Sequence, residues 1–362
     1  MRLDFINTIL VEARAGAQPH PEDSIFDGQA SAQQALSSLA YVIKNPGSVT
    51  IKFDGMPALI FGRLRDGRFT IQDKYMFDAK YFADSPKAWE KYDLNKKSGK
   101  TRPDLYQKVA NIWAGLEQAV GNSPGFFWGD LLWSQPLKPK GNMFVFKPNV
   151  VEYHIPVKSD LGKQIVGRIG GIVVHQYFAD DGAQPQQWNG QGLKLDGTVA
   201  VLTPSAGIKF KLDDPVQLHK AATNAVSQYG QVTESFLTGL DGVAKAAIQK
   251  YMNHRITGQT NQELVDWLAT NVSKVQYKKL LGEEGHGYLA QNINGVKGLF
   301  AIWNALYAFK ENLAQQLEQQ VQGIEQYVNG QKEGEGFVFN TPQGLVKLVQ
   351  RGSFSRALFA KE

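Results

Sequence analysis

The chain contains no cysteine among its 362 residues. Disulfide bonds, thiolate catalysis and thiolate-bound zinc are therefore excluded, and no cysteine pattern indicates secretion. No stretch approaches the roughly 18 apolar residues that a membrane span requires. The first residues, MRLDFINTILVEARAG, carry Asp4 and Glu12 and lack the apolar core of a signal peptide. We therefore expect an intracellular, cytoplasmic protein without a membrane partner.

Motifs of several enzyme classes are also missing. No GxxxxGK[ST] loop is present, and RIGGIVVH, residues 168–175, does not match the GxGxxG pattern of dinucleotide-binding proteins. The six histidines show no HExxH spacing, so the sequence indicates no zinc site.

The excess of positive charge is small. The formal net charge is +5 and the pI is about 9.0, which is compatible with a polyanionic partner but does not require one. The composition, 43% hydrophobic and 20% charged, is typical of a globular protein with a sizeable core. The length allows two domains, or one domain with a large insertion.

The pattern along the chain predicts a helical block between two strand-rich regions. Helices are expected at residues 3–14, 29–44 and 104–120, and strands from Gly47 onwards with an Asp66-Gly67 hairpin turn. Long helical patterns fill the chain from about residue 215 to 329, after which strand signals return. We therefore predict an α+β fold in which residues 1–212 and 331–362 form one domain and residues 213–330 a helical insertion.

A lysine interrupts an otherwise apolar, strand-like run, GSVTIKFDGMPALIFGR. In a continuous strand Lys52 and Asp54 would share a face, since residues two apart project to the same side. A charge pair on an edge strand would explain this pattern. The alternative is a nucleophilic lysine in a nucleotide pocket.

Further short motifs follow in a fixed order. They are KFDG at residues 52–55, IQDKYMF with Lys74, FFWGDLL with Asp130, IGGIVVHQYF with His175 and Tyr177, EGFVF with Glu335, and LVKLV with Lys347. Lys347 follows Glu335 by twelve positions.

This series resembles the motifs of the covalent nucleotidyltransferase superfamily, which comprises ATP-dependent RNA and DNA ligases and mRNA capping enzymes. It is most similar to the RNA ligases, including ligase-like proteins of phages, for which the compartment would be the host cytoplasm. The resemblance implies a ligase-type fold with antiparallel sheets and flanking helices. It also implies that Lys52 forms a covalent lysyl-AMP intermediate, with ATP as the nucleotide and GTP as the alternative. RNA is the acceptor it favours over DNA.

The resemblance also implies roles for individual residues. A free lysine is almost fully protonated at neutral pH, and a closed pocket with Lys347 and a metal nearby would favour its neutral, nucleophilic form. Asp54 would bind the ribose or a hydrated metal. Asp130 and Glu335 would ligate Mg²⁺ or Mn²⁺. The nucleotide contacts would come from Ile51, Lys52, Gly55, Lys74, Asp130, His175, Tyr177 and Lys347, with His175 or Tyr177 in the base-stacking place.

Each assignment has a simpler alternative. Asp130 could cap a turn, Glu335 could be a solvated loop acid, and His175 could be an ordinary strand histidine. The chain also departs from the superfamily at Met56-Pro57, after the KxDG glycine, and at Val349, where a second lysine is common. A rival KxK pair occurs in GIKFKL, residues 207–212, but the strand that would then be the fourth motif, GGIVVH, lacks the metal-binding acid.

Three functions follow from these observations. The first is an RNA-ligase-like enzyme that joins 5′-phosphate to 3′-hydroxyl ends, with DNA nick sealing as its nearest variant. The eleven residues after Arg351 leave no room for the appended domain of DNA ligases and capping enzymes. The second is a capping-type nucleotidyltransferase, and the third is a non-catalytic nucleic-acid-binding protein on a ligase scaffold. A basic loop is a candidate phosphate contact, with a solvated lysine-rich loop as the alternative; its residues are Lys91, Lys96, Lys97, Lys100 and Arg102. The oligomeric state is left open.

Overall fold

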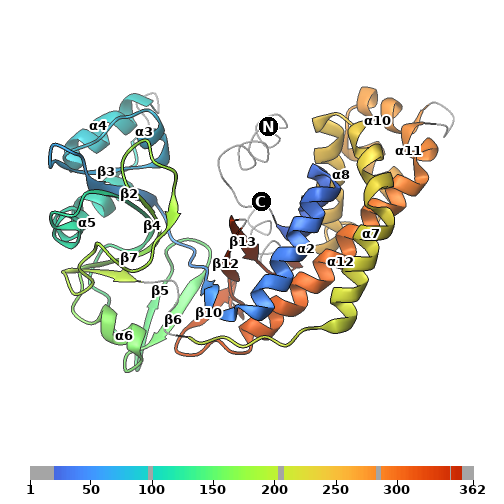
Figure 1. The fold of residues 1–362 in the computed structure, drawn as a ribbon. Coiled ribbons are helices and arrows are strands. Elements are labelled where there is room, and N and C mark those ends of the chain that lie inside the picture. Colours follow the sequence, from blue (N-terminus) through green and yellow to red (C-terminus); the bar gives the residue numbers. More distant parts are fainter. Residues whose placement is uncertain (1–19, 97–100, 203–207, 283–286, 343, 353–362) are drawn as a thin grey trace. The chain divides into compact units, whose positions relative to one another are not determined.

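The structure, a computed structural model, describes residues 20–96, 101–202, 208–282, 287–342 and 344–352 (Figure 1). It is a mixed α+β fold with three mainly antiparallel sheets, as the sequence predicts. The chain divides into two compact units. The sheet unit comprises Thr50–Ile208 and Val321–Glu335, and the helical unit comprises Met1–Val49, Lys209–Gln320 and Gly336–Glu362.

These units do not coincide with the predicted domains. Helix α2 (Gln29–Lys44) belongs with the helical segment, because it packs on α7 (Val216–Thr238) and the Gln29 N–H donates to Glu234 Oε2 at 3.1 Å. In the other direction, residues 321–335 join the sheet unit, because β10 (Glu325–Val328) pairs with β6 (Glu152–Pro156). Both differences arise from pairing between distant segments.

The larger sheet of the sheet unit has the order β3-β2-β4-β7-β8, and β9 runs parallel to β7. Its strands are β2 (Ala58–Arg63), β3 (Phe69–Gln72), β4 (Gly125–Trp133), β7 (Gly170–Phe178), β8 (Gln186–Gln187) and β9 (Val199–Leu202). The predicted Asp66-Gly67 turn joins β2 to β3, and Gly67 adopts the positive φ of 86° that such a turn requires.

Helix α5 (Pro103–Val120) covers one face of this sheet. Its buried residues recur at helical spacing and include Ile112 and Leu116, which pack against Phe61 and Phe127. The predicted helix at 104–120 is thus confirmed. The remaining helices of this unit are α3 (Lys74–Asp78), α4 (Pro86–Lys96) and α6 (Asp160–Ile165).

A second sheet of the same unit has the order β11-β10-β6-β5, with β5 at Met143–Phe146 and β11 at Gln331–Lys332. Tyr153, on β6, is fully buried and stacks on Phe146. This stack fixes the segment that connects β5 to β6, which matters for the site below.

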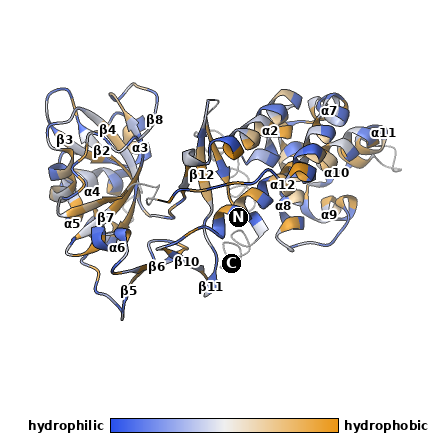
Figure 2. Ribbon diagram, turned by 60° about the horizontal axis from the view of Figure 1, so that its bottom comes forward, coloured by the Kyte–Doolittle hydropathy of each residue, from blue (hydrophilic) through white to orange (hydrophobic). Residues whose placement is uncertain are grey.

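The helical unit is built on long amphipathic helices. Figure 2 shows hydrophobic and hydrophilic residues alternating along them, as expected for helices with one buried face. Its helices are η1 (Pro21–Asp27), α2, η2 (Pro46–Ser48), α7, α8 (Gly242–Ile256), α9 (Leu264–Asn271), α10 (Lys274–Leu281), α11 (Tyr288–Gln291) and α12 (Ile293–Glu318). Its small sheet has the order β1-β12-β13, with β12 (Phe337–Thr341) and β13 (Gly344–Leu348) forming the predicted hairpin; β1 (Val49–Ile51) begins at the last residue of this unit's first segment.

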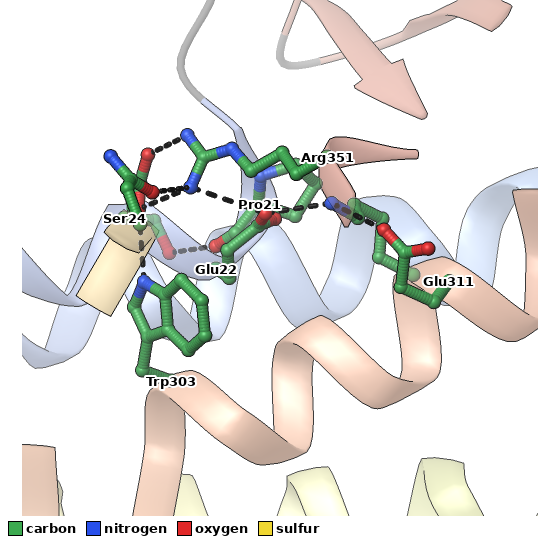
Figure 3. Close-up of polar contacts among 9 residues, drawn as sticks. Pro21, Glu22, Ser24, Trp303, Glu311 and Arg351 are labelled. Carbon is green, nitrogen blue, oxygen red and sulfur yellow. Dashed lines mark hydrogen bonds and ion pairs between the residues drawn. The ribbon is translucent and has the colours of Figure 1, made fainter. Parts of the chain in front are cut away.

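A buried ionic cluster lies inside the helical unit (Figure 3). Lys310 Nζ, on α12, is 2.7 Å from Glu22 Oε1 and 3.1 Å from Glu311 Oε1. Arg351 pairs with Asp23, whose Oδ1 also accepts a hydrogen bond from Trp303 Nε1 at 2.9 Å. The cluster thus joins η1, α12 and the segment after β13, which are far apart in the sequence.

Candidate active site

The KFDG segment lies in the sheet unit, directly after β1. Because β1 ends at Ile51, Lys52 and Asp54 lie in an irregular loop rather than in a continuous strand. The expectation that the two side chains share a strand face is therefore wrong. Ile51 itself is buried in β1.

Lys52 forms an ion pair with Glu335. The Lys52 side chain is 28% exposed, whereas that of Glu335 is 4% exposed. The Glu335 backbone N–H donates to Gln326 Oε1 at 2.9 Å, which fixes the residue beside β10. Glu335 is therefore a buried acid and not a solvated loop residue, and it brings the first and fourth motifs together.

The aromatic residue of KFDG anchors the loop. Phe53 is buried, and its ring stacks on Tyr153 with the centroids 5.5 Å apart. The Asp54 N–H donates to the Tyr153 hydroxyl at 2.5 Å. Burial raises the pKa of Tyr153 well above its ordinary value, so the phenol stays neutral.

The Asp54 carboxylate binds the connection between β5 and β6. Its Oδ1 accepts a hydrogen bond from Asn149 Nδ2 at 2.9 Å. Its Oδ2 accepts from the backbone N–H groups of Val150 at 2.6 Å and Val151 at 3.1 Å. Among the contacts described, Lys52 therefore pairs with Glu335, whereas Asp54 binds Asn149 and the Val150 and Val151 amides.

The glycine of KFDG lies against β4. A Cβ at Gly55 would come within 2.6 Å of Asp130 Cβ and 2.9 Å of Leu131 O, so only glycine fits this close approach. The next residue is held too, since the Met56 N–H donates to Leu131 O at 2.9 Å. The loop is thus fixed on both sides of Lys52 and ends next to Asp130.

Asp130 lies within β4 and does not cap a turn. Its Oδ2 is 3.0 Å from His175 Nε2. The two strands pair as Asp130↔Val173, Gly129↔Val174 and Trp128↔Gln176, so His175 is an extra residue in β7. Such a β-bulge re-aims a side chain, and here it directs the imidazole to the face that carries Asp130.

The bulge also separates the two candidate stacking residues. Tyr177 pairs with Phe127, packs against its ring with the centroids 5.2 Å apart, and belongs to the core beneath α5. Residues two apart in a regular strand share a face, but His175 and Tyr177 do not. The structure therefore does not bring Tyr177 to the side where Asp130 and His175 meet.

The two remaining predicted lysines lie on other elements. Lys74 is the first residue of α3, next to the N-cap Asp73, and is half-buried. Lys347 lies on β13 opposite Val338, in the helical unit. Of the rival KxK pair, neither lysine lies in a strand.

The basic loop is only partly described. Lys97 and Lys100 lie outside the described residues, and Lys96 is exposed at the end of α4. Arg102 binds the buried Asp93, and this hydrogen bond raises the pKa of Arg102. Arg102 thus neutralises a buried acid, a role that its place in a basic loop did not indicate.

The predicted metal ligands can be tested only against the described residues. Within that part of the chain, no three His, Cys, Asp or Glu side chains gather as a metal site would need. Glu335 Oε2 is buried and has no hydrogen-bond partner there, which fits a cation ligand. Asp130 is already hydrogen-bonded to His175. Of the two predicted metal ligands, only Glu335 therefore has a buried carboxylate oxygen that a metal ion could use.

Sequence reasoning missed the residues that hold the loop. Asn149 and Tyr153, which meet the loop, and Gln326, which holds Glu335, belong to no recognisable motif and come from distant segments of the chain. No local signal could have identified them.

The fold and this site define a mixed α+β protein with an anchored, lysine-bearing loop. The chain matches, over residues 19–362, the model of DUF6267, a family of unknown function, and belongs to that family. No curated protein and no solved structure matches it. In the described part of the chain, no helix is both long and apolar enough to cross a bilayer.

Proposed function

We propose that the protein is an ATP-dependent polynucleotide ligase, most similar to RNA ligases, that forms a covalent lysyl-AMP at Lys52. The observation that carries this proposal is the ion pair between Lys52 and Glu335. These residues come from the first and fourth motifs of the resemblance, at opposite ends of the chain. The meeting of Gly55 with Asp130 adds a second such convergence.

The contacts suggest how Lys52 is activated. The Lys52 ammonium passes one proton to the Glu335 carboxylate, and the resulting amine attacks the α-phosphorus of ATP. The new N–P bond replaces the P–O bond to the β-phosphate, pyrophosphate leaves with the bonding electrons, and the second amine proton goes to solvent. AMP then passes to a 5′-phosphate end, and a 3′-hydroxyl displaces it. Mg²⁺ or Mn²⁺ that arrives with the nucleotide would neutralise phosphate charge, since Glu335, once protonated, is a poor metal ligand.

The first test is covalent labelling. Wild-type protein cleared of bound nucleotide is incubated with α-labelled ATP, and separately GTP, with Mg²⁺ or Mn²⁺, and run on a denaturing gel. We expect label in the wild type and none in Lys52→Ala. Lys163→Ala is the matched control, since Lys163 is an exposed lysine of the same unit that pairs only with the exposed Asp160 among the contacts described.

Two outcomes would overturn the proposal. Label that persists in Lys52→Ala would mean that another residue is the nucleophile. No label with either nucleotide in folded wild type would leave the second candidate, a nucleic-acid-binding protein on a ligase scaffold. That candidate is favoured by one observation: the two acids expected to bind metal, Asp130 and Glu335, already have His175 and Lys52 as partners.

If label forms, the acceptor is identified next. Labelled protein is offered 5′-phosphorylated RNA, the same sequence as DNA, and an RNA with a 5′-diphosphate end. Joined RNA would support the ligase, joined DNA the nick-sealing variant, and a capped end the capping-type reaction.

A further inference from the structure

We infer that Asp54 is a positioning residue, and that Asn149 and Tyr153 hold the nucleophile loop through it. This inference rests on the proposed function and changes the role that the resemblance gives to Asp54. The expected role was to bind the ribose or a hydrated metal. The contacts of the Asp54 carboxylate favour a different task.

Both oxygens of the Asp54 carboxylate are engaged by the chain itself. Asn149 Nδ2 donates to Oδ1, while two consecutive backbone N–H groups, those of Val150 and Val151, converge on Oδ2. Hydrogen bonds to an ionised acceptor are among the stronger ones in proteins, and three on one carboxylate fix its position and orientation. Three of the roughly four acceptor sites of the carboxylate are thus taken by the chain, which leaves about one, on Oδ1, for a ligand.

The donors lie on a well-anchored segment. Val150 and Val151 are buried, and Tyr153 stands in a stack between Phe53 and Phe146, with the centroids 5.5 and 5.4 Å away. Tyr153 also accepts the Asp54 N–H. The β5–β6 connection and β6 therefore bind Asp54 through both the Asp54 backbone N–H and the Asp54 carboxylate.

The contacts of Asp54 also restrict the position of Lys52, two residues earlier in the chain. Phe53 and Asp54 bind the β5–β6 connection, and Gly55 and Met56 bind β4, so the residues after Lys52 are all attached to the sheets. Lys52 is the member of this loop whose side chain pairs with Glu335. A fixed loop places its amine without the need to order a flexible chain during the reaction.

A charge swap separates the two roles of Asp54. In Asp54→Asn with Asn149→Asp, the residue 54 amide donates to the residue 149 carboxylate, while its oxygen still accepts from Val150 and Val151. The hydrogen bonds are kept, but the negative charge at position 54 is lost. Positioning survives this swap, whereas binding of a metal or ribose by a carboxylate at 54 does not.

We expect the single variants Asp54→Asn and Asn149→Asp each to lower the kcat of lysyl-AMP formation about 100-fold, with the KM for ATP unchanged. The double variant should recover to within about threefold of wild type. Tyr153→Phe, which removes the acceptor of the Asp54 N–H, should lower kcat about tenfold. Asn111→Ala is the control, because Asn111 Nδ2 bonds Ser134 O elsewhere in the same unit.

A double variant as inactive as Asp54→Asn would overturn the inference. So would a raised KM for ATP in Asn149→Ala, a variant that removes the Asn149 amide without adding a charge. If the wild type takes up no label, the proposed function fails and the inference on Asp54 is tested separately.

The attachment of the loop can be measured without nucleotide, by hydrogen exchange of the Asp54 and Met56 amides. Exchange must quicken in Asn149→Asp and slow again in the swap; unchanged exchange would overturn the anchor itself.

Discussion

Two of the lysine–glutamate pairs among the described residues lie in opposite settings. Lys310 and Glu22, in the helical unit, are both 0% exposed, whereas the Lys52 side chain in the sheet unit keeps 28% exposure beside a buried Glu335. Each glutamate has a second oxygen without a hydrogen-bond partner in the described part of the chain. An unpartnered carboxylate oxygen therefore does not distinguish them. What distinguishes them is the exposure of the lysine, and we therefore call Lys310–Glu22 the closed pair and Lys52–Glu335 the open pair.

The residues around the two lysines also differ. Around Lys310, further charges close the site: Glu311 on one side, and Arg351 with Asp23 on the other. Around Lys52, the residues that follow it bind β4 and β6, and the lysine side chain keeps 28% exposure. The closed pair thus belongs to a cluster that joins three chain segments, whereas the open pair positions the Lys52 amine.

The largest expected effect breaks the open pair. Lys52→Ala should reduce covalent labelling at least about 1,000-fold, because the nucleophile is lost. The same variant leaves the buried Glu335 carboxylate without its cation, so it should also lower the free energy of unfolding, by about 1–3 kcal/mol. Labelling and urea unfolding of the same preparation check both expectations.

The next effect breaks the closed pair. Lys310→Met should lower the free energy of unfolding by about 3–5 kcal/mol, because it leaves buried carboxylates uncompensated. Urea unfolding followed by circular dichroism measures this. Adding Glu22→Met should recover part of the loss; if the double variant is no more stable than Lys310→Met, the cost does not come from unpaired charge.

A smaller effect concerns pH. Burial alone would raise the pKa of Asp23, but Arg351 outweighs it and holds the pKa below the ordinary 3.8. A carboxyl with a lowered folded-state pKa stabilises the fold above its unfolded value, and this stabilisation is lost as the pH falls through the folded value. Asp23→Asn should therefore be less stable than wild type at pH 7, and the gap should narrow below about pH 3.8. Denaturant unfolding across this range tests it, and a constant gap would contradict the ionic role of Asp23.

The smallest effect tests the two sides of β7. Tyr177→Phe should leave lysyl-AMP formation within about twofold of wild type. The Tyr177 ring is partly buried and packs against Phe127, and its hydroxyl contacts only Pro124 O at 3.3 Å among the contacts described. A large fall in labelling at unchanged stability would show that Tyr177 does reach the nucleotide.

Local patterns predicted much of the fold. Helix α5 and the β2–β3 hairpin follow from apolar spacing and from a turn signal within a few residues. The boundaries of the two units could not be found this way. They depend on α2 packing against α7 and on β10 pairing with β6, contacts between segments hundreds of residues apart in the first case.

The candidate site divides similarly. The order of the motifs predicted that Lys52 and Glu335 belong together, and in the structure they form an ion pair. The partners of Asp54 could not be predicted, since Asn149 and Tyr153 resemble ordinary loop and strand residues. That His175 and Tyr177 lie on opposite faces of β7 could not be predicted either, because one extra residue reverses the alternation and no local signal marks it.

That extra residue has an evolutionary consequence. If His175 were deleted, Val174, Gln176 and Tyr177 would continue as a regular strand, and each would keep its present partner on β4. On the other side of β7, the His175 carbonyl accepts a hydrogen bond from the N–H of the buried Trp188 at 3.0 Å, in line with the pairing of Gln176 with Gln187 on β8. A single-codon deletion would therefore remove the imidazole and keep the pairing with β4, but the edge strand β8 would have to absorb the change in length.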